Sequence, residues 1–192
     1  MIDFFDYKNN LAPAKGMLLV SEPFLEDPNF DRTVILLCEH NDQGSFGFVI
    51  NKSANITLKD VVEIADTRDQ QLYLGGPVEH NTLHFIHRFP TLVNAVEIVN
   101  GIYWGGDFDQ LLTLLDTGDA TEEDVKFFVG YSGWEIDQLH EEVKIDSWIV
   151  SDIKDPDLLF MQEENELWKR VLDGLGGKFK IYSKYPIDPR LN

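Results

Sequence analysis

Two apolar segments separated by a short polar turn restrict the fold of this chain more than any other feature. Residues 32–40 (RTVILLCEH) hold an unbroken apolar run, and residues 45–51 (SFGFVIN) are rich in aromatic and β-branched residues. Between them, residues 41–44 (NDQG) have the composition of a turn. Two strand-like runs joined by so short a turn predict a β-hairpin, whose first strand is buried.

The rest of the chain alternates between strand and helix patterns. Asn100-Gly101 is a preferred two-residue hairpin turn, and it separates apolar runs at 95–99 and 102–106. Asp107 precedes an amphipathic segment that stops at Gly118, which predicts a capped helix. We expect further strands at 16–20, 72–80, 82–87, 125–132 and 147–152, and further helices at 57–65, 135–143 and 164–176.

Frequent hairpins among these elements favour an α/β fold of the α+β type over a doubly wound parallel fold. We expect a single compact domain over residues 1–192, with a mixed, largely antiparallel sheet flanked by helices. Residues 1–15 are expected to form an N-terminal arm, and residues 177–192 a basic C-terminal tail.

The net charge is the strongest compositional signal for function. The chain carries 16 Lys and Arg against 34 Asp and Glu, for a formal net charge of -18 at pH 7. Because affinity for nucleic acid comes largely from cations on phosphates, direct nucleic-acid binding is disfavoured. The acidic stretch from residue 135 to residue 173 is either a solvated face or a docking surface for a basic protein.

Two further features favour a cytoplasmic protein. The one cysteine, Cys38, cannot form an intrachain disulfide, which is usual in reducing compartments. The first residues, MIDFFDYKNN, lack the basic and apolar regions of a signal peptide, and no apolar run approaches the length of a membrane span. We therefore expect no association with a membrane.

Residues 130–134 (GYSGW) come close to the G-x-S-x-G turn that presents a nucleophilic serine in α/β-hydrolases. That turn needs a small residue two positions after the serine, where this chain has Trp134. A hydrolase also needs a downstream histidine, and only His140 follows, on an expected helix. We therefore expect a strand-to-helix turn in which Gly133 relieves the bend, Ser132 bonds a local backbone amide and Trp134 anchors the helix in the core.

Other reactive groups also have structural interpretations that we favour. Cys38 and His40 share a strand face, but a cysteine beside an apolar run is usually an inert small hydrophobe. His80, His84 and His87 would share one face only on a helix, and this segment alternates like a strand. No catalytic residue, metal or cofactor is expected.

Arg32 and Asn51 flank the predicted hairpin and could line a pocket with Glu39. An arginine that follows Asp31 in such a loop more often ties the loop down, through a salt bridge or through backbone carbonyls. A ligand-binding role for these polar residues remains the alternative.

The chain resembles the AlgH/YqgE family of bacterial proteins. The resemblance lies in GMLLVSEPFLEDPNFDRTVILLCEHNDQGSFGFVINK (16–52), LYLGGPVEHNTLHFIHR (72–88), FFVGYSGWEIDQLHEE (127–142) and SWIV (147–150). It implies one α/β domain with a mixed, barrel-like sheet flanked by helices, in a bacterial cytosolic protein. It also implies a regulatory role, linked in name to alginate production, and no agreed catalytic residues or cofactor.

The chain departs from the family pattern at one place. The usual run is similar to G-Y-[SA]-G-W-G-P-G-Q-L, and here Glu135, Ile136 and Asp137 replace the Gly-Pro-Gly before Gln138 and Leu139. These replacements can continue a helix, so we expect a helix here in place of the turn.

Three functions remain open. We favour a non-catalytic regulatory or interaction protein that affects transcription indirectly through a protein partner. The alternative is a small-molecule-binding protein or an unrecognised enzyme, and the third is a direct DNA-binding regulator. The alternative predicts that far-separated polar residues converge on one pocket. The candidate ligand or interaction surface consists of Arg32, Asn51, His87, Ser132, Trp134 and Gln138.

Overall fold

The chain folds around one long central strand, β9 (Val125–Trp134), in a computed structural model that describes residues 11–63 and 70–186. The other strands are β1 (Leu18–Ser21), β2 (Val34–Asn41), β3 (Gly44–Val49), β4 (Ser53–Thr57), β5 (Gln71–Leu74), β6 (Val78–His87), β7 (Val96–Val99), β8 (Ile102–Trp104) and β10 (Trp148–Ser151). The helices are α1 (Phe108–Thr117), α2 (Gln138–Lys144), α3 (Glu164–Leu175) and α4 (Phe179–Tyr182), with 3-10 turns η1 (Leu58–Asp60) and η2 (Pro156–Phe160).

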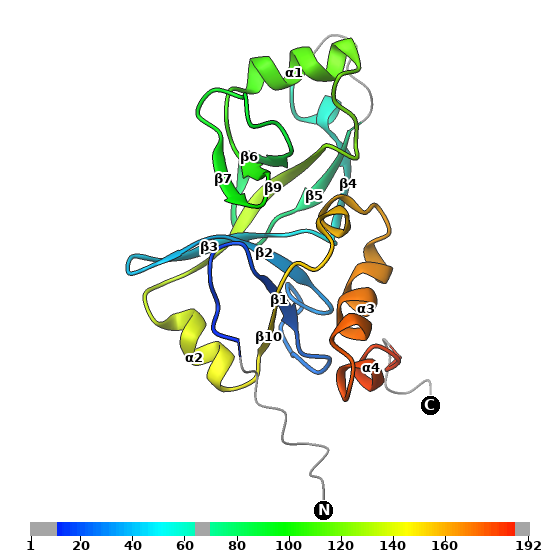
Figure 1. Cartoon of the computed structure of the whole chain (residues 1–192). Coiled ribbons are helices and arrows are strands. Elements are labelled where there is room, and N and C mark those ends of the chain that lie inside the picture. Colours follow the sequence, from blue (N-terminus) through cyan, green and yellow to red (C-terminus); the bar gives the residue numbers. More distant parts are fainter. Residues whose placement is uncertain (1–10, 64–69, 187–192) are drawn as a thin grey trace, which may run out of the picture.

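β9 joins two parts of one mixed sheet, whose strand order is β10-β1-β2-β3-β9-β6-β8-β7. The C-terminal half of β9 pairs with β3, and its N-terminal half lies between β5 and β6. All pairings are antiparallel except that of β5 with β9. Figure 1 shows α1 and β4–β8 on one side of this junction, with β1, β2, β10, α2, α3 and α4 on the other. The predicted mixed, largely antiparallel fold is confirmed, although the described strands form an open sheet and not a closed barrel.

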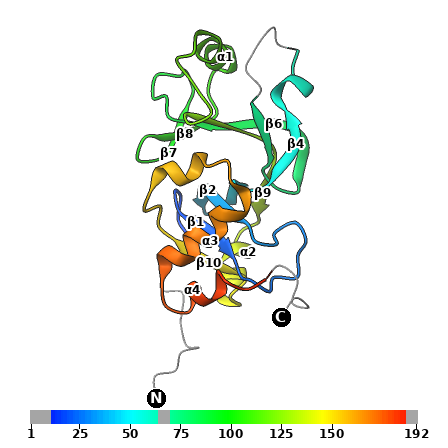
Figure 2. The ribbon, with the colours of Figure 1, turned by 90° about the vertical axis from the view of Figure 1, so that its right-hand side faces the viewer.

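The predicted hairpin of β2 and β3 is present, and helices cover both of its faces. Leu36 packs in one core with Trp168 of α3, whereas Ile35 and Leu37 pack in another core with Leu139 of α2. Figure 2 shows α3 crossing in front of β1 and β10. The first five residues of β2, Val34 to Cys38, are covered on both faces and have no solvent-facing position, which explains their unbroken apolar sequence.

Two further predictions are confirmed at α1 and at the hairpin of β7 and β8. The Asp107 carboxylate accepts the backbone N–H of Gln110, and Gly118 ends α1 in the left-handed conformation. Asn100 and Gly101 both have positive φ, 46° and 79°, as the tightest hairpin turns require.

Two element predictions were wrong. β6 runs unbroken from Val78 to His87, so the chain has no turn between residues 80 and 82, and the break falls instead at Gly75–Pro77. The predicted helix from residue 57 is only the 3-10 turn η1, although Asp60 accepts the Thr57 N–H as expected. Residues 64 and 65 of that prediction lie outside the described residues, and β4 was not predicted.

The described part of the expected tail is folded. Phe179 of α4 is buried in the core with Leu172 of α3, and the Ser183 hydroxyl donates to Asp173 at 2.6 Å. Residues 1–10 of the expected arm and residues 187–192 of the tail lie outside the described residues. None of the helices in residues 11–63 and 70–186 combines the length and apolarity that crossing a membrane requires.

Candidate functional site

Arg32 and Asn51 hold the start of β2 against the C-terminal part of the chain. The Arg32 guanidinium donates to the carbonyls of Tyr185 (2.6 Å) and Pro186 (2.7 Å), and its Cζ lies 4.9 Å from the ring centre of Trp168. The Asn51 side chain accepts a backbone N–H of β2 at 2.8 Å and donates to the Arg32 carbonyl at 2.9 Å. Arg32 therefore holds backbone carbonyls, as predicted, but they belong to the distant C-terminal segment.

His87 is fully buried, and both of its ring nitrogens are engaged. Nε2 lies 2.8 Å from the Gly105 carbonyl, to which it donates, and Nδ1 accepts the Phe89 N–H at 3.1 Å. This arrangement fixes a neutral tautomer, and burial lowers the pKa of His87 against the opposing effect of the Gly105 hydrogen bond. His87 is therefore placed as a core histidine.

Ser132 lies within β9 and not in a strand-to-helix turn, so that prediction was wrong. Its side chain is fully buried, and its hydroxyl donates to the Gly75 carbonyl at 3.1 Å. Gly130 has a left-handed φ of 68°, and the register of β6 against β9 shifts around it. The GYSGW motif is thus an irregularity inside a strand, and its serine is closed to substrates.

Trp134 and Gln138 meet at the carboxylate of Glu142. The indole N–H groups of Trp134 and Trp148 donate to one oxygen of Glu142 at 2.8 and 2.7 Å, and the Gln138 amide donates to the other at 2.9 Å. Trp134 is buried beside Leu139 of α2, which confirms that it anchors this helix in the core.

The segment 135–137 does not continue the helix, so that expectation was wrong. α2 begins at Gln138, and Asp137 before it has a left-handed φ of 63°. Glycine adopts this conformation most readily, and aspartate more readily than most other residues. The Gln138 side chain also accepts the Glu135 N–H at 3.0 Å. A turn is therefore kept at the place where the family pattern has Gly-Pro-Gly.

The six candidate residues do not converge on one pocket. Trp134 and Gln138 line one open concavity, whereas the other four lie elsewhere in the fold.

The remaining reactive groups are a buried thiol and a histidine–serine pair at the edge of the concavity. Cys38 is fully buried, and burial raises the pKa of its thiol well above the ordinary value. The Nδ1 atom of His40 lies 2.7 Å from the Ser45 hydroxyl. Within residues 11–63 and 70–186, no three His, Cys, Asp or Glu side chains are grouped so that they could hold a metal ion.

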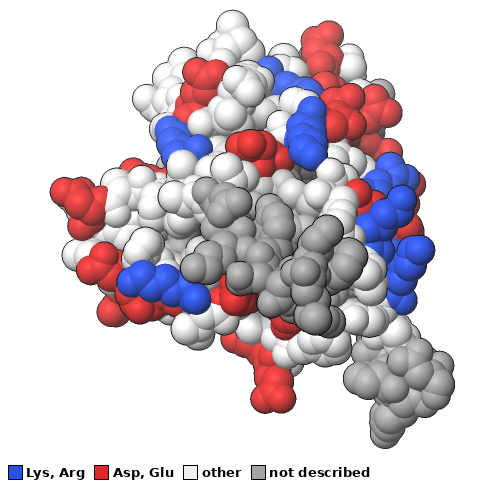
Figure 3. Space-filling view, turned by 60° about the horizontal axis from the view of Figure 1, so that its bottom comes forward, with Lys and Arg blue, Asp and Glu red and all other residues white. Residues whose placement is uncertain are grey.

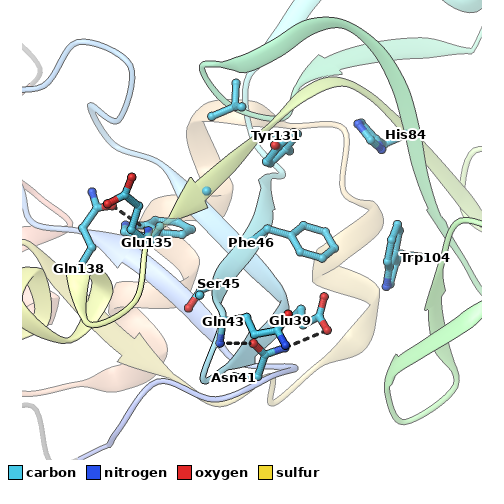
Figure 4. A pocket seen from close by; sticks show the side chains of 14 residues that line it. Glu39, Asn41, Gln43, Ser45, Phe46, His84, Trp104, Tyr131, Glu135 and Gln138 are labelled. Carbon is cyan, nitrogen blue, oxygen red and sulfur yellow. Dashed lines mark hydrogen bonds between the residues drawn. The ribbon is translucent and has the colours of Figure 1, made fainter.

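The concavity lined by Trp134 and Gln138 is an open groove of about 830 Å³, which we call the aromatic groove. It lies where the tip of the β2–β3 hairpin, β6, β8 and the end of β9 meet (Figure 4). Its walls carry the rings of Phe46, His84, Trp104 and Tyr131, and its polar side chains include Glu39, Asn41, Gln43, Glu135 and Gln138.

Strand register places these side chains together. In the β2–β3 pairing a shift between Leu37 and Glu39 sets Glu39 directly opposite Phe46, so both side chains point to one face of the sheet. In the β3–β9 pairing Phe46 lies opposite Gly133, which has no side chain to fill the space. The left-handed Gly130 lets Tyr131 pack on the same core as Phe128, despite their odd separation in sequence.

The His84 ring is neutral at the wall of the groove. Burial lowers its pKa, and the charge of Glu79 opposes this shift. The Thr82 hydroxyl gives its proton to the Glu79 carbonyl at 2.8 Å, so it accepts from His84 Nε2 at 2.9 Å. The aromatic groove is therefore apolar on its ring side and negatively charged at Glu39 and Glu135.

A second, smaller concavity of about 600 Å³ is lined mainly by acidic side chains. Its Arg88 donates to Asp157 at 2.6 Å, and the guanidinium Cζ lies 4.4 Å from the Phe160 ring centre. This cation is already paired within the chain, and the acidic side chains are Glu122, Glu123, Asp124, Asp157 and Glu163.

Sequence reasoning missed Phe46, Trp104 and Tyr131, the residues that give the aromatic groove its character. A weak signal was present, since Tyr131 stands inside GYSGW and Trp104 directly precedes a Gly-Gly pair. Neither motif shows that the two rings face the same space, because that depends on the pairing of β6 with both β8 and β9.

Comparisons with known proteins cover nearly the whole chain. A model of the AlgH-like family matches residues 18–180. A UPF0301 protein of Cytophaga hutchinsonii is 47% identical over 181 residues, which cover 93% of this chain and 99% of that relative. A UPF0301 protein of Bacteroides thetaiotaomicron is 38% identical over 186 residues, which cover 96% of this chain and 94% of that relative.

Two solved structures share the fold. The solution structure of the AlgH protein from Pseudomonas aeruginosa aligns with a TM-score of 0.72 at 28% identity, over 92% of this chain and 97% of that chain. The crystal structure of a protein from Corynebacterium diphtheriae aligns with a TM-score of 0.74 at 24% identity, over 91% of this chain and 94% of that chain.

Proposed function

This chain belongs to the AlgH-like family, and from that premise we propose that it is a non-catalytic interaction protein. In this proposal it binds a segment of a partner protein in the aromatic groove, works in the cytoplasm, and affects transcription only indirectly through that partner. The observation that carries the proposal is the groove itself, an open concavity of about 830 Å³ with half-buried aromatic side chains.

Half-buried rings in an open concavity are typical of binding surfaces. Aromatic side chains give large contact area at low conformational cost, and they are enriched where proteins bind one another. Phe46, Trp104 and Tyr131 are partly exposed at the groove, although each also packs on the main core. They are therefore held firmly by the fold while one side of each remains available to a partner.

The buried reactive side chains of the described chain give less support to an enzyme. Ser132 and Cys38 are residues that can act as nucleophiles, but both side chains are buried, and burial raises the pKa of the Cys38 thiol. Both ring nitrogens of His87 are hydrogen-bonded to backbone groups. Catalysis through a nucleophile needs a base within hydrogen-bond reach and an approach for the substrate, and buried groups of this kind offer no such approach.

The charge distribution favours a protein partner over nucleic acid. The net charge of -18 opposes the approach of a polyanion. On the face shown in Figure 3, acidic side chains are interspersed among the basic ones, which form separate small groups. A nucleic-acid-binding surface needs its cations gathered along one track.

Affinity capture from native lysate tests the proposal, with the wild-type chain, a Trp104→Ala variant and a Phe24→Ala control. Trp104 lines the groove, whereas Phe24 is an exposed aromatic residue that does not. We expect a near-stoichiometric protein that is captured by the wild type and the control and lost with Trp104→Ala. Trp134 would be a poor choice, because its removal would leave a cavity beside Leu139. Capture that is indifferent to Trp104 would contradict the proposal.

The volume of the groove also supports a second candidate, a small-molecule-binding protein. Ligand pockets commonly have volumes of about 300–1,000 Å³, and the aromatic groove falls in that range. A metabolite library screened by thermal unfolding separates the two candidates. A compound that raises the melting temperature of the wild type, but not that of Trp104→Ala, would favour this second function.

A further inference from the structure

The ring of Phe46 stands at a steep angle to the rings of both Trp104 and Tyr131 in the aromatic groove. Phe46 and Trp104 have ring centres 5.0 Å apart and an interplanar angle of 77°, and Phe46 and Tyr131 are 6.2 Å apart at 81°. Rings at nearly right angles form adjacent walls, as Figure 4 shows for Phe46 and Trp104. Such walls direct electron-rich ring faces toward a shared space, where a cation is attracted by the ring quadrupoles.

Carboxylates line the groove or lie near its wall. Glu39 stands opposite Phe46 in the strand pairing, and Glu135 lines the groove at the end of β9. Glu79 lies close enough to raise the pKa of His84 through its charge. No lysine or arginine of the described chain lines the groove. Its electrostatic character is therefore negative, and its apolar walls strengthen the attraction of a cation that enters.

The chain places its own cations on other rings. Arg32 lies 4.9 Å from the centre of Trp168, Arg88 lies 4.4 Å from that of Phe160, and Lys126 lies 4.1 Å from that of Tyr73. In each pair the protein supplies both partners. The aromatic groove has the rings of such a pair, and its lining side chains include neither lysine nor arginine, while its one histidine, His84, is neutral.

We propose that the aromatic groove recognises a lysine or arginine side chain on an extended segment of the partner protein. The cationic head lies against Phe46, Trp104 and Tyr131, and it is balanced by Glu39, which stands opposite Phe46 in the strand pairing. This inference rests on the proposed function and specifies the partner chemistry. The groove extends from the hairpin tip at Asn41 to Gln138 and is larger than one cationic group, so flanking residues of the segment occupy the remainder.

The test selects random twelve-residue peptides by phage display on the immobilised wild-type protein, with counter-selection on Trp104→Ala. Selected peptides are then synthesised with each Lys or Arg replaced by Gln, and binding is measured by calorimetry. We expect the selected peptides to share a basic residue whose replacement weakens binding about tenfold or more, as expected for a partly desolvated cation–π contact.

Variants of the protein check the same contact without relying on one substitution. We expect Trp104→Ala to weaken binding of the basic peptide about tenfold, and Glu39→Gln about threefold. Glu39 is exposed, so Glu39→Gln leaves the core intact. Glu26→Gln is the matched control, because it removes one exposed carboxylate that does not line the groove. If Glu39→Gln and Glu26→Gln lowered peptide affinity equally, the change would reflect net charge alone, and the proposal would be overturned.

The outcomes separate this inference from the proposed function. Peptides that depend on Trp104 but bind equally well after Lys or Arg is replaced by Gln would overturn the inference and leave a peptide-binding groove. No Trp104-dependent peptide at all would overturn both. Spermidine and N-acetyl-arginine amide are titrated in parallel. If either one binds as tightly as the peptide, the ligand of the groove is a free cation and not a segment of a partner protein, and the inference is overturned.

Discussion

The two halves of β9 carry two aromatic sites that differ in what completes them. In the N-terminal half, Lys126 is buried with its ammonium 4.1 Å from the Tyr73 ring centre, and it donates to the carbonyls of Ile50 (2.9 Å) and Met161 (2.6 Å). In the C-terminal half, Tyr131 faces the open aromatic groove together with Phe46. The first site is closed within the fold, and the second is open to solvent.

If the groove binds a partner as proposed, this difference lets one strand serve both folding and binding. A buried ammonium loses its hydration, and it is tolerated only where acceptors of the protein replace the water. The Lys126 site meets that condition with two backbone carbonyls and one ring, so it is a site of structure. The aromatic groove has half-exposed rings and carboxylates at its edge, so a cation could enter there without losing all of its water.

The largest expected effect is a change in stability with pH that depends on Lys126. Burial lowers the pKa of Lys126 to about 7, against the opposing charge of Glu164. The unfolded lysine titrates near 10.4, so between these values the unfolded state binds more protons and stability rises with pH. From pH 7 to 9.5 we expect a gain of about 3 kcal/mol in the free energy of unfolding.

Urea unfolding of the wild type and Lys126→Met across this pH range isolates the effect. The wild-type curve should rise relative to the variant, and parallel curves would show that Lys126 is not the group responsible. The range stops below pH 10 because burial raises the pKa of Tyr73 to about 12. Its folded pKa is higher than its unfolded value, so Tyr73 takes stability away above pH 10, which is the opposite sign.

At pH 9.5, where the folded protein holds Lys126 neutral, Lys126→Met should cost about 2 kcal/mol of stability. Methionine has a similar volume, but it leaves the Ile50 and Met161 carbonyls without their donor, and an unsatisfied buried acceptor costs about 1–3 kcal/mol. Lys154→Met is the control, since Lys154 also donates to a carbonyl, that of Gly174 at 2.8 Å, but is exposed. It should cost less than about 0.5 kcal/mol.

A folded Lys126→Met protein that no longer binds basic peptides would break the proposed division between the two sites.

Glu39→Lys should convert the open site into one that resembles the closed site. Residue 39 stands opposite Phe46 on the same face, so a lysine there can place its own ammonium on the groove rings. We expect basic-peptide affinity to fall more than tenfold, with a change of less than about 0.5 kcal/mol in stability, because the residue is exposed. Glu26→Lys makes the same charge change away from the groove. An equal loss of affinity in that control would contradict the idea that the introduced lysine places its own ammonium on the groove rings.

Features that depend on neighbouring residues could be read from the sequence. The Asn100-Gly101 turn, the Asp107 cap and the apolar run of β2 each follow from local backbone preference or from burial on both faces. These signals gave the hairpins, α1 and the fold class. The parallel pairing of β5 with β9 left no such signal, because it joins residues more than fifty positions apart.

The site was harder to predict than the fold for the same reason. Ser132 and Arg32 attracted attention through motifs and residue type, yet their partners are Gly75 and Tyr185, which no local pattern identifies. Phe46 and Trp104 read as ordinary apolar strand residues, and only the assembled sheet brings their rings to 5.0 Å. Gly130 stands in the GYSGW motif, which suggests a turn that exposes the serine. Its positive φ instead redirects the Tyr131 side chain and leaves the serine buried.

The smallest expected effect tests the turn that borders the aromatic groove. Asp137 has a φ of 63°, a conformation that costs most L-residues about 1–2 kcal/mol and aspartate somewhat less. Asp137→Gly should therefore stabilise the protein by about 0.5 kcal/mol, since relief of strain exceeds the added flexibility of the unfolded chain. Asp137→Ala should destabilise it by about 1 kcal/mol, because alanine keeps the Cβ and loses the tolerance of aspartate for this conformation. Thermal unfolding of both variants measures this difference in stability.

The affinity of either variant for the basic peptide should stay within about twofold of the wild-type value. The reason is that Glu135 and Gln138 line the groove and Asp137 does not. Destabilisation by glycine would mean that the Asp137 side chain holds this turn through contacts of its own, and that the Gly-Pro-Gly of the family pattern forms a different one.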